Sequence, residues 1–168
     1  MTTYTEKKFK GLLLKRQLPK GSITVNGSLG LGNCTGLKAL PDNLTVNGYL
    51  TNCTGLKALP DNLTVNGYLN LTNCTGLTAL PENLTVNGSL DLDGCKGFTA
   101  LPNNLTVKGS LSLEGCTGLK SFYKVKVQGT IFFDDSLISR IPNEELIKHL
   151  GMSPEIDALI ARRFKEGP

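Results

Sequence analysis

A Leu-Pro dipeptide returns at nearly constant intervals along most of this chain, and this repeat constrains the fold more than any other feature. Successive copies lie 22, 19, 21 and 21 residues apart. The copies are Leu18-Pro19, Leu40-Pro41, Leu59-Pro60, Leu80-Pro81 and Leu101-Pro102, with Ile141-Pro142 as a degenerate sixth. Such a period predicts a solenoid, in which each unit completes its apolar core only by stacking on its neighbours.

The pattern inside each unit indicates β-structure. From Leu80 to Ala100 the unit reads LPENLTVNGSLDLDGCKGFTA. Its Gly-x-Leu-x-Leu segment alternates strictly, so both leucines, for example Leu69 and Leu71, should point inward from a short strand. The Leu-Thr-Val segment, as in 63–65, could form a second parallel ladder. The Asn-Gly between them predicts a tight turn with positive φ, and the unit is too short for a proper helix as well.

The repeat also divides the chain into three parts. We predict an N-terminal cap over residues 1–17, a solenoid of about six coils over 18–142 and a C-terminal helical cap over 143–168. Apolar residues that should cover the two ends are Phe9 and Leu12–Leu14 at the start, and helices Asn143–Leu150 and Pro154–Phe164 at the end. The expected fold class is therefore a mainly β repeat solenoid, capped at its N-terminus and closed by α-helix at its C-terminus.

Units such as Leu90-x-Leu92-x-x-Cys95, followed by Phe98, resemble the leucine-rich-repeat family. The Leu-Pro after each strand is most similar to the short bacterial and phage subtypes, and the resemblance covers residues 18–142. It implies a parallel β-solenoid with one strand per coil, lining a concave face that such proteins usually use to bind other proteins.

Two departures from the family pattern leave an alternative open. The first leucine of the family motif would fall at Asn87, whereas the apolar residue is Val86. The leucine after the cysteine comes one place late. A generic two-ladder β-solenoid with less curvature therefore remains the alternative to a leucine-rich repeat.

Five cysteines are predicted to form a ladder of free, buried thiols. Cys34, Cys53, Cys74, Cys95 and Cys116 share one unit position, and Ser136 takes it in the sixth coil. Their odd number, their identical position and the lack of a secretory pattern favour reduced thiols in a cytoplasmic protein, or in the host cytoplasm if a phage encodes the chain. The single histidine, His149, has no obvious nucleophile companion, so we expect no metal site and no cofactor.

The unit positions that vary between coils are the candidates for function. On the solvent side of the Gly-x-Leu-x-Leu strands they form three columns. The first is Ser28, Tyr49, Tyr68, Ser89, Ser110 and Thr130; the second is Gly30, Thr51, Asn70, Asp91, Ser112 and Phe132; the third is Gly32, Thr72, Asp93, Glu114 and Asp134. Tyrosines lie toward one end and acids toward the other, which is typical of a binding surface.

Charge argues against two other classes of partner. The formal net charge is +4, and the excess lies in residues 1–17, which suggests a solvated cap. An acidic strand face disfavours nucleic acid, since phosphates would meet Asp91, Asp93, Glu114 and Asp134. No long apolar run predicts a membrane span.

These observations favour a non-catalytic protein-binding module. The residues expected to contact the partner are Tyr49, Tyr68, Asn70, Asp91, Asp93, Ser112, Glu114 and Phe132, together with adjoining loops. A sharper alternative is an inhibitor encoded by a phage or mobile element that blocks a host enzyme or defence complex. A second alternative is a β-solenoid hydrolase or lyase that uses Asp91, Asp93 and Glu114. The partner's identity and the oligomeric state stay open.

Overall fold

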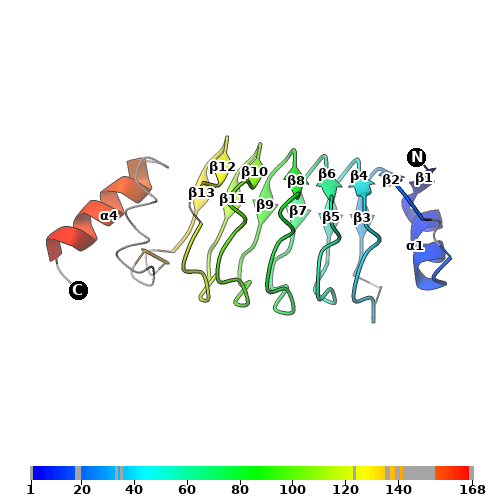
Figure 1. Ribbon diagram of the computed structural model, residues 1–168, viewed down its shortest axis with the longest axis horizontal. Helices are drawn as coiled ribbons and strands as arrows, with labels where there is room; N and C mark the ends of the chain where they lie inside the picture. Colours follow the sequence, from blue (N-terminus) through cyan, green and yellow to red (C-terminus); the bar gives the residue numbers. More distant parts are fainter. Residues whose placement is uncertain are drawn as a thin grey trace.

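In a computed structural model the chain forms a parallel β-solenoid with a helix at each end (Figure 1). The structure describes residues 2–17, 20–32, 34, 36–122, 124–134, 137–138, 141 and 154–166. Each coil contributes one strand to a seven-stranded sheet, here sheet A, and one to a six-stranded sheet, here sheet B. The predicted fold class is confirmed. The chain has two ladders, as the two-ladder alternative expected, whereas the leucine-rich-repeat resemblance implied one strand per coil.

Sheet A is built from the Leu-Thr-Val segments, as predicted, and is extended by one strand from the N-terminus. Its strands, in spatial order, are β1 (Thr2–Thr5), β2 (Ile23–Asn26), β4 (Leu44–Val46), β6 (Thr64–Val65), β8 (Thr85–Val86), β10 (Thr106–Val107) and β12 (Lys126–Val127). All pairs are parallel, and equivalent unit positions face each other, for example Thr64 opposite Thr85.

Sheet B is built from the Gly-x-Leu-x-Leu segments. Its strands are β3 (Leu29–Gly30), β5 (Leu50–Thr51), β7 (Leu69–Asn70), β9 (Leu90–Asp91), β11 (Leu111–Ser112) and β13 (Ile131–Phe132). Both leucines of the motif are buried, as Leu69 and Leu71 show with no exposed surface. Because side chains alternate along a strand, the residues between and beside these leucines face solvent and form a candidate binding surface.

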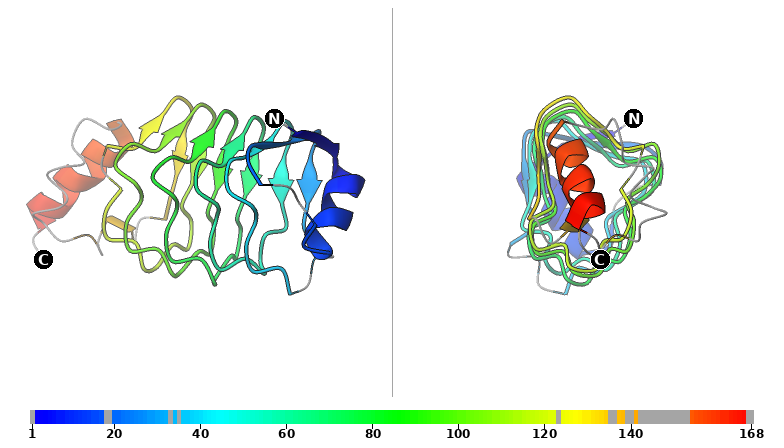
Figure 2. Two further views of the ribbon diagram at one scale, coloured as in Figure 1. Left: turned by 45° about the vertical axis from the view of Figure 1, so that its right-hand side comes forward. Right: turned by 90° about the vertical axis from the view of Figure 1, so that its left-hand side faces the viewer.

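Seen along the solenoid axis, the outlines of successive coils nearly coincide (Figure 2, right). The inward leucines, valines and cysteines of all coils join one continuous core. The coil between Leu40 and Leu59, which is two residues shorter than the usual unit, keeps its place, because Leu50 pairs in register with Leu29 on one side and Leu69 on the other.

Glycines at the corner between the two sheets have a different role from the predicted one. Of the six glycines at this corner, only Gly27 has a positive φ, of 92°. In later coils the glycine is needed for space: a Cβ atom on Gly88 would lie 2.5 Å from the carbonyl oxygen of Gly67 in the preceding coil. The prediction of left-handed turns was therefore wrong for Gly48, Gly67, Gly88, Gly109 and Gly129. At these positions glycine is needed because neighbouring coils approach closely, and not because of its backbone conformation.

The N-terminal cap combines a strand and a helix. β1 pairs with β2, and α1 (Glu6–Leu14) follows it across the first coil (Figure 2, left). Phe9 is fully buried, and Leu12 and Leu13 pack partly against the core, as predicted. Leu14 is 57% exposed, so the expectation that it covers the coil was wrong, because the helix ends there and turns this side chain outward.

A helix closes the other end. α4 (Pro154–Glu166) lies beyond the last coil, and the view along the axis places it within the outline of the coils (Figure 2, right). Its Ile156 and Ile160 are buried. Arg163 Nη1 donates a hydrogen bond of 2.6 Å to the carbonyl oxygen of Ile141. Phe164, which was predicted to pack inward, is exposed. The other predicted helix, over 143–150, and Ser136 and His149 lie outside the described residues.

Candidate functional site

The predicted site residues lie together on the outward side of sheet B. We call this surface, made of the three columns defined above, the strand face. The register places its middle column in line, with Asp91 opposite Asn70 and Ser112, and Ser112 opposite Phe132. The surface follows the long axis of the solenoid (Figure 1).

Two tyrosines form the aromatic part of the strand face. The ring centroids of Tyr49 and Tyr68 are 6.4 Å apart, and the rings meet edge to face at 80°. Tyr49 is 55% exposed, whereas Tyr68 is half-buried. Contact with Tyr49 and a hydrogen bond to Asp91 hold Tyr68 against the sheet. The two residues therefore differ: Tyr68 supports Tyr49, and Tyr49 presents its ring to solvent. Phe132, in the last coil, is 49% exposed and lies at the other end of the face.

Hydrogen bonds fix the orientation of Tyr68. Its hydroxyl donates to Asp91 Oδ2 at 2.6 Å and accepts from Asn70 Nδ2 at 3.1 Å. Asn70 Oδ1 in turn accepts the backbone N–H of Thr72. Desolvation, and then the hydrogen bond to Asp91, raise the pKa of Tyr68 to about 12. The phenol therefore remains protonated and acts as a donor under all physiological conditions.

The aspartates of the strand face are already engaged within the chain. Asp91 Oδ1 accepts the N–H of Asp93 at 3.0 Å. Asp93 Oδ1 accepts both the hydroxyl of Ser112, at 2.5 Å, and the N–H of Glu114, at 3.0 Å. Asp91 and Asp93 thus order the turns that follow the strands, while Glu114 is exposed. Carboxylates used in this way are held in fixed orientation, which suits recognition by shape and charge.

Serines of the first column also have a structural role that the sequence did not reveal. Ser28 Oγ accepts the N–H of Tyr49, and Ser89 Oγ accepts the N–H of Ser110, each at 3.0 Å. Ser110 Oγ accepts the N–H of Thr130 in the same way. A serine here thus satisfies the backbone of the next coil.

The N-terminal cap contacts the first strand of sheet B at Gly30. Glu6 Oε1 accepts a hydrogen bond from the N–H of Gly30 at 3.0 Å, and Lys10 Nζ donates one to the carbonyl oxygen of Gly30 at 2.7 Å. Glu6 and Lys10 also form an ion pair of 3.6 Å. From sequence, this pair four residues apart on a helix indicates only a surface ion pair. The cap thus occupies Gly30, whereas Ser28 and Gly32 of the same coil are exposed. The first aromatic residue of the strand face is Tyr49, in the second coil.

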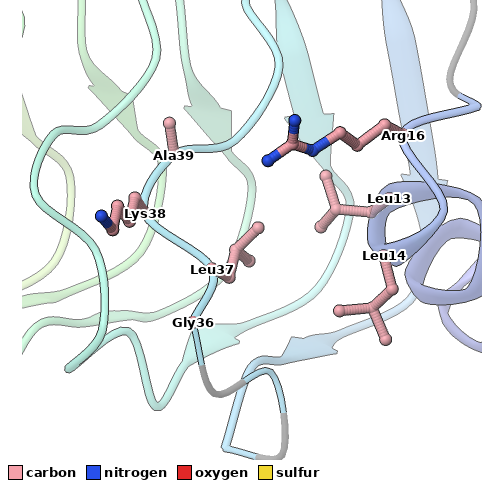
Figure 3. A pocket seen from close by; sticks show the side chains of 7 residues that line it. All are labelled: Leu13, Leu14, Arg16, Gly36, Leu37, Lys38 and Ala39. Atoms are coloured by element: carbon pink, nitrogen blue, oxygen red, sulfur yellow. The ribbon is translucent and has the colours of Figure 1, made fainter.

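A separate hollow lies at the loop edge beside the C-terminal end of α1 (Figure 3). Its volume is about 620 Å³, and it is lined by Leu13, Leu14, Arg16, Gly36, Leu37, Lys38 and Ala39. The leucine side chains line one region of the hollow and the Arg16 side chain reaches across it (Figure 3). Lys38 thus lies beside an apolar surface together with a second cation, Arg16.

The cysteine ladder is buried, and its thiols are free, as predicted. Cys95 Sγ donates to the carbonyl oxygen of Leu71 at 2.9 Å, and Cys116 Sγ to that of Leu92 at 3.1 Å. Burial, more than any neighbouring charge, raises the pKa of Cys53, Cys74 and Cys116 to about 12. The pKa of Cys95 rises to about 11, also through desolvation. These groups are therefore thiols, not reactive thiolates, at neutral pH.

We expect this burial to suppress thiol chemistry in the native protein. The thiolate is the reactive species, so a raised pKa lowers the reactive fraction throughout the neutral range. A thiol reagent at pH 7 should modify the native chain slowly and all five cysteines after denaturation. Raising the pH to about 9, near the ordinary cysteine pKa, should accelerate the denatured reaction far more than the native one. A disulfide in the intact mass of freshly purified protein would contradict this prediction.

Among the described residues, no three histidine, cysteine, aspartate or glutamate side chains are grouped so as to hold a metal ion. Within the same residues, no helix is long and apolar enough to cross a membrane.

Comparison with protein-family models, with curated proteins and with solved structures gave no match for this chain.

Proposed function

We propose that this chain is a non-catalytic protein-binding module whose partner docks on the strand face around Tyr49. The observation that carries the proposal is an exposed tyrosine on a rigid support: Tyr49 packs edge to face on Tyr68, whose hydroxyl is held by Asp91. Exposed aromatic side chains held in place by their neighbours make strong interface contacts, because little conformational entropy is lost on binding.

Variation between coils supports the same surface. The units repeat their inward residues closely, whereas the middle column of the strand face differs in every coil. The resemblance of Leu90-x-Leu92-x-x-Cys95 to leucine-rich repeats, which usually bind proteins through their strands, adds support. The engagement of Asp91 and Asp93 by backbone N–H groups favours binding over acid–base chemistry.

The size of the strand face indicates that other parts of the chain join the interface. Six strands at ~4.8 Å spacing, with three outward residues each at ~3.3 Å, give a strip of roughly 25 by 10 Å. A standard interface buries about 800 Å² on each partner, which is more than such a strip provides. The adjoining loops, which carry Lys38, Lys57 and Lys120, are the natural extension.

Replacing Tyr49 and Tyr68 together with serine tests the proposal. Serine occupies this position in other coils and accepts a backbone N–H of the next coil, so the fold should stay intact. The partner, captured from the native host with the unmodified chain, should bind the double variant more weakly by about 2 kcal/mol or more in calorimetry. The matched comparison reverses the charge of Lys38, Lys57 and Lys120. Unchanged affinity for the serine variant, with loss on charge reversal, would place the site at the loop edge and refute the proposal.

A further inference from the structure

The outward side of sheet A has one residue type in almost every strand. Its middle column consists of Thr3, Thr24, Thr45, Thr64, Thr85 and Thr106, paired in register from β1 to β10, with Lys126 following in β12. We call these six residues the threonine column. It lies on a different sheet from the strand face (Figure 1).

The two sheets differ in how much their outward residues vary. The middle column of sheet B holds a different residue in each of its strands, from Gly30 and Thr51 to Phe132. Both columns belong to the same repeated unit, so both have had the same opportunity to diverge. The constancy of threonine therefore indicates a requirement that acts on the outer surface of sheet A.

Hydrogen bonding within the protein does not explain that requirement. In the part of the chain that the structure describes, Thr106 is the one member of the column whose hydroxyl has a hydrogen bond, to the carbonyl oxygen of Asn104 at 3.4 Å. Thr24 is 4% exposed, and its Oγ1 is buried with no partner. A ligand on the outer surface cannot reach that buried hydroxyl, so the part of the column open to a ligand consists of Thr3, Thr45, Thr64, Thr85 and Thr106, none of which is buried.

The neighbouring asparagines behave differently. Asn47 Nδ2 donates to Asn26 Oδ1 at 2.9 Å, Asn66 to Asn47 at 2.9 Å and Asn87 to Asn66 at 2.7 Å. This ladder connects four successive coils, and side-chain ladders of this kind favour a flat sheet. The nearly coincident outlines of the coils agree with it (Figure 2, right). The asparagine ladder thus holds the threonine column straight, with its members ~4.8 Å apart.

We propose that the threonine column binds the surface of ice. A regular row of uncharged hydroxyl and methyl groups calls for a ligand that is itself periodic and can donate and accept a hydrogen bond at each step. Water molecules in an ice lattice meet both conditions, because each is a donor and an acceptor at a fixed repeat. The inference concerns a different face from the proposed protein-binding site and does not depend on it.

A protein partner fits this column less well. A stripe one residue wide offers far less than the ~800 Å² that each side of a standard interface buries. A second copy of the chain, face to face, would bury rows of hydroxyls between two sheets, and each hydroxyl left without a partner would oppose association.

The test compares two double variants of the full chain. In the first, Thr64→Lys and Thr85→Lys place in the column the residue that Lys126 already provides in β12. The matched control, Thr78→Lys and Thr99→Lys, makes the same chemical change at exposed loop positions that are lysine in the units of Lys57 and Lys120. Thermal denaturation should show that both variants are folded.

Ice itself is the probe. The unmodified chain and the control should hold the freezing temperature of a small ice crystal below its melting temperature and should be enriched in slowly grown ice. The Thr64→Lys, Thr85→Lys variant should lose most of both effects. Exclusion of the unmodified chain from ice, or equal activity of the column variant, would overturn the proposal. A dimer in light scattering that only the column variant dissociates, without activity on ice, would assign the face to a second copy and would also overturn it.

Discussion

Replacing Gly88 with alanine should lower the free energy of unfolding by about 3 kcal/mol, the upper end of the cost of overpacking a well-packed site. The new Cβ atom would lie 2.5 Å from the carbonyl oxygen and 2.6 Å from the carbonyl carbon of Gly67. Both are backbone atoms, and the corner is tied to its neighbours by the hydrogen bond from the N–H of Gly109 to the carbonyl oxygen of Gly88, at 2.9 Å. The coils would have to separate to accept the methyl group.

Gly11→Ala is the matched control, since it adds the same methyl group in open space. No atom lies within 4 Å of a Cβ at Gly11, which is a residue of α1. Alanine favours a helix over glycine by up to about 1 kcal/mol, so this variant should be neutral or slightly more stable. Urea denaturation of both variants measures the difference. Equal midpoints would show that the corner glycines do not limit the approach of the coils.

The glycine column shows where sequence reasoning stops. Asn-Gly correctly marked the corner of the first four coils, because a turn must lie between two strands of one unit. Glycine is needed at Gly48 and Gly88 because one coil lies very close to the next. The sequence of a single unit does not show how close the coils lie. Gly27 alone has the positive φ that the dipeptide suggested, at the first corner.

Strand positions were predictable because parity along a strand decides which side chains are buried. The inward leucines of the strands and the grouping of Tyr49, Asn70 and Asp91 on one face follow from that rule. The hydrogen bond from Tyr68 to Asp91 does not, because it joins different unit positions of neighbouring coils and depends on side-chain rotamers. The hydrogen bond from the N–H of Gly30 to Glu6 could not be predicted for a similar reason, since it joins a strand to a helix residue 24 positions away.

Replacing Phe9 with alanine should destabilise the protein by about 4 kcal/mol, within the usual cost of removing a buried phenylalanine. Phe9 has no exposed surface, and its ring lies 6.5 Å from that of Tyr4, centroid to centroid. Together these rings close the apolar end of the first coil. Because a solenoid is stabilised by contacts between neighbours only, an open end should unfold first and expose the next coil in turn.

Leu14→Ala, in the same helix, is the control, because Leu14 is 57% exposed and its removal should change stability by no more than about 0.5 kcal/mol. Amide hydrogen exchange distinguishes the loss of an end from general weakening. In the Phe9 variant, protection should fall first in β1 and β2, whereas β8 and β10, several coils away, should keep most of theirs. An equal loss of protection in all these strands would show that the coils unfold as one unit, and that the N-terminal cap stabilises the whole solenoid instead of its first coil.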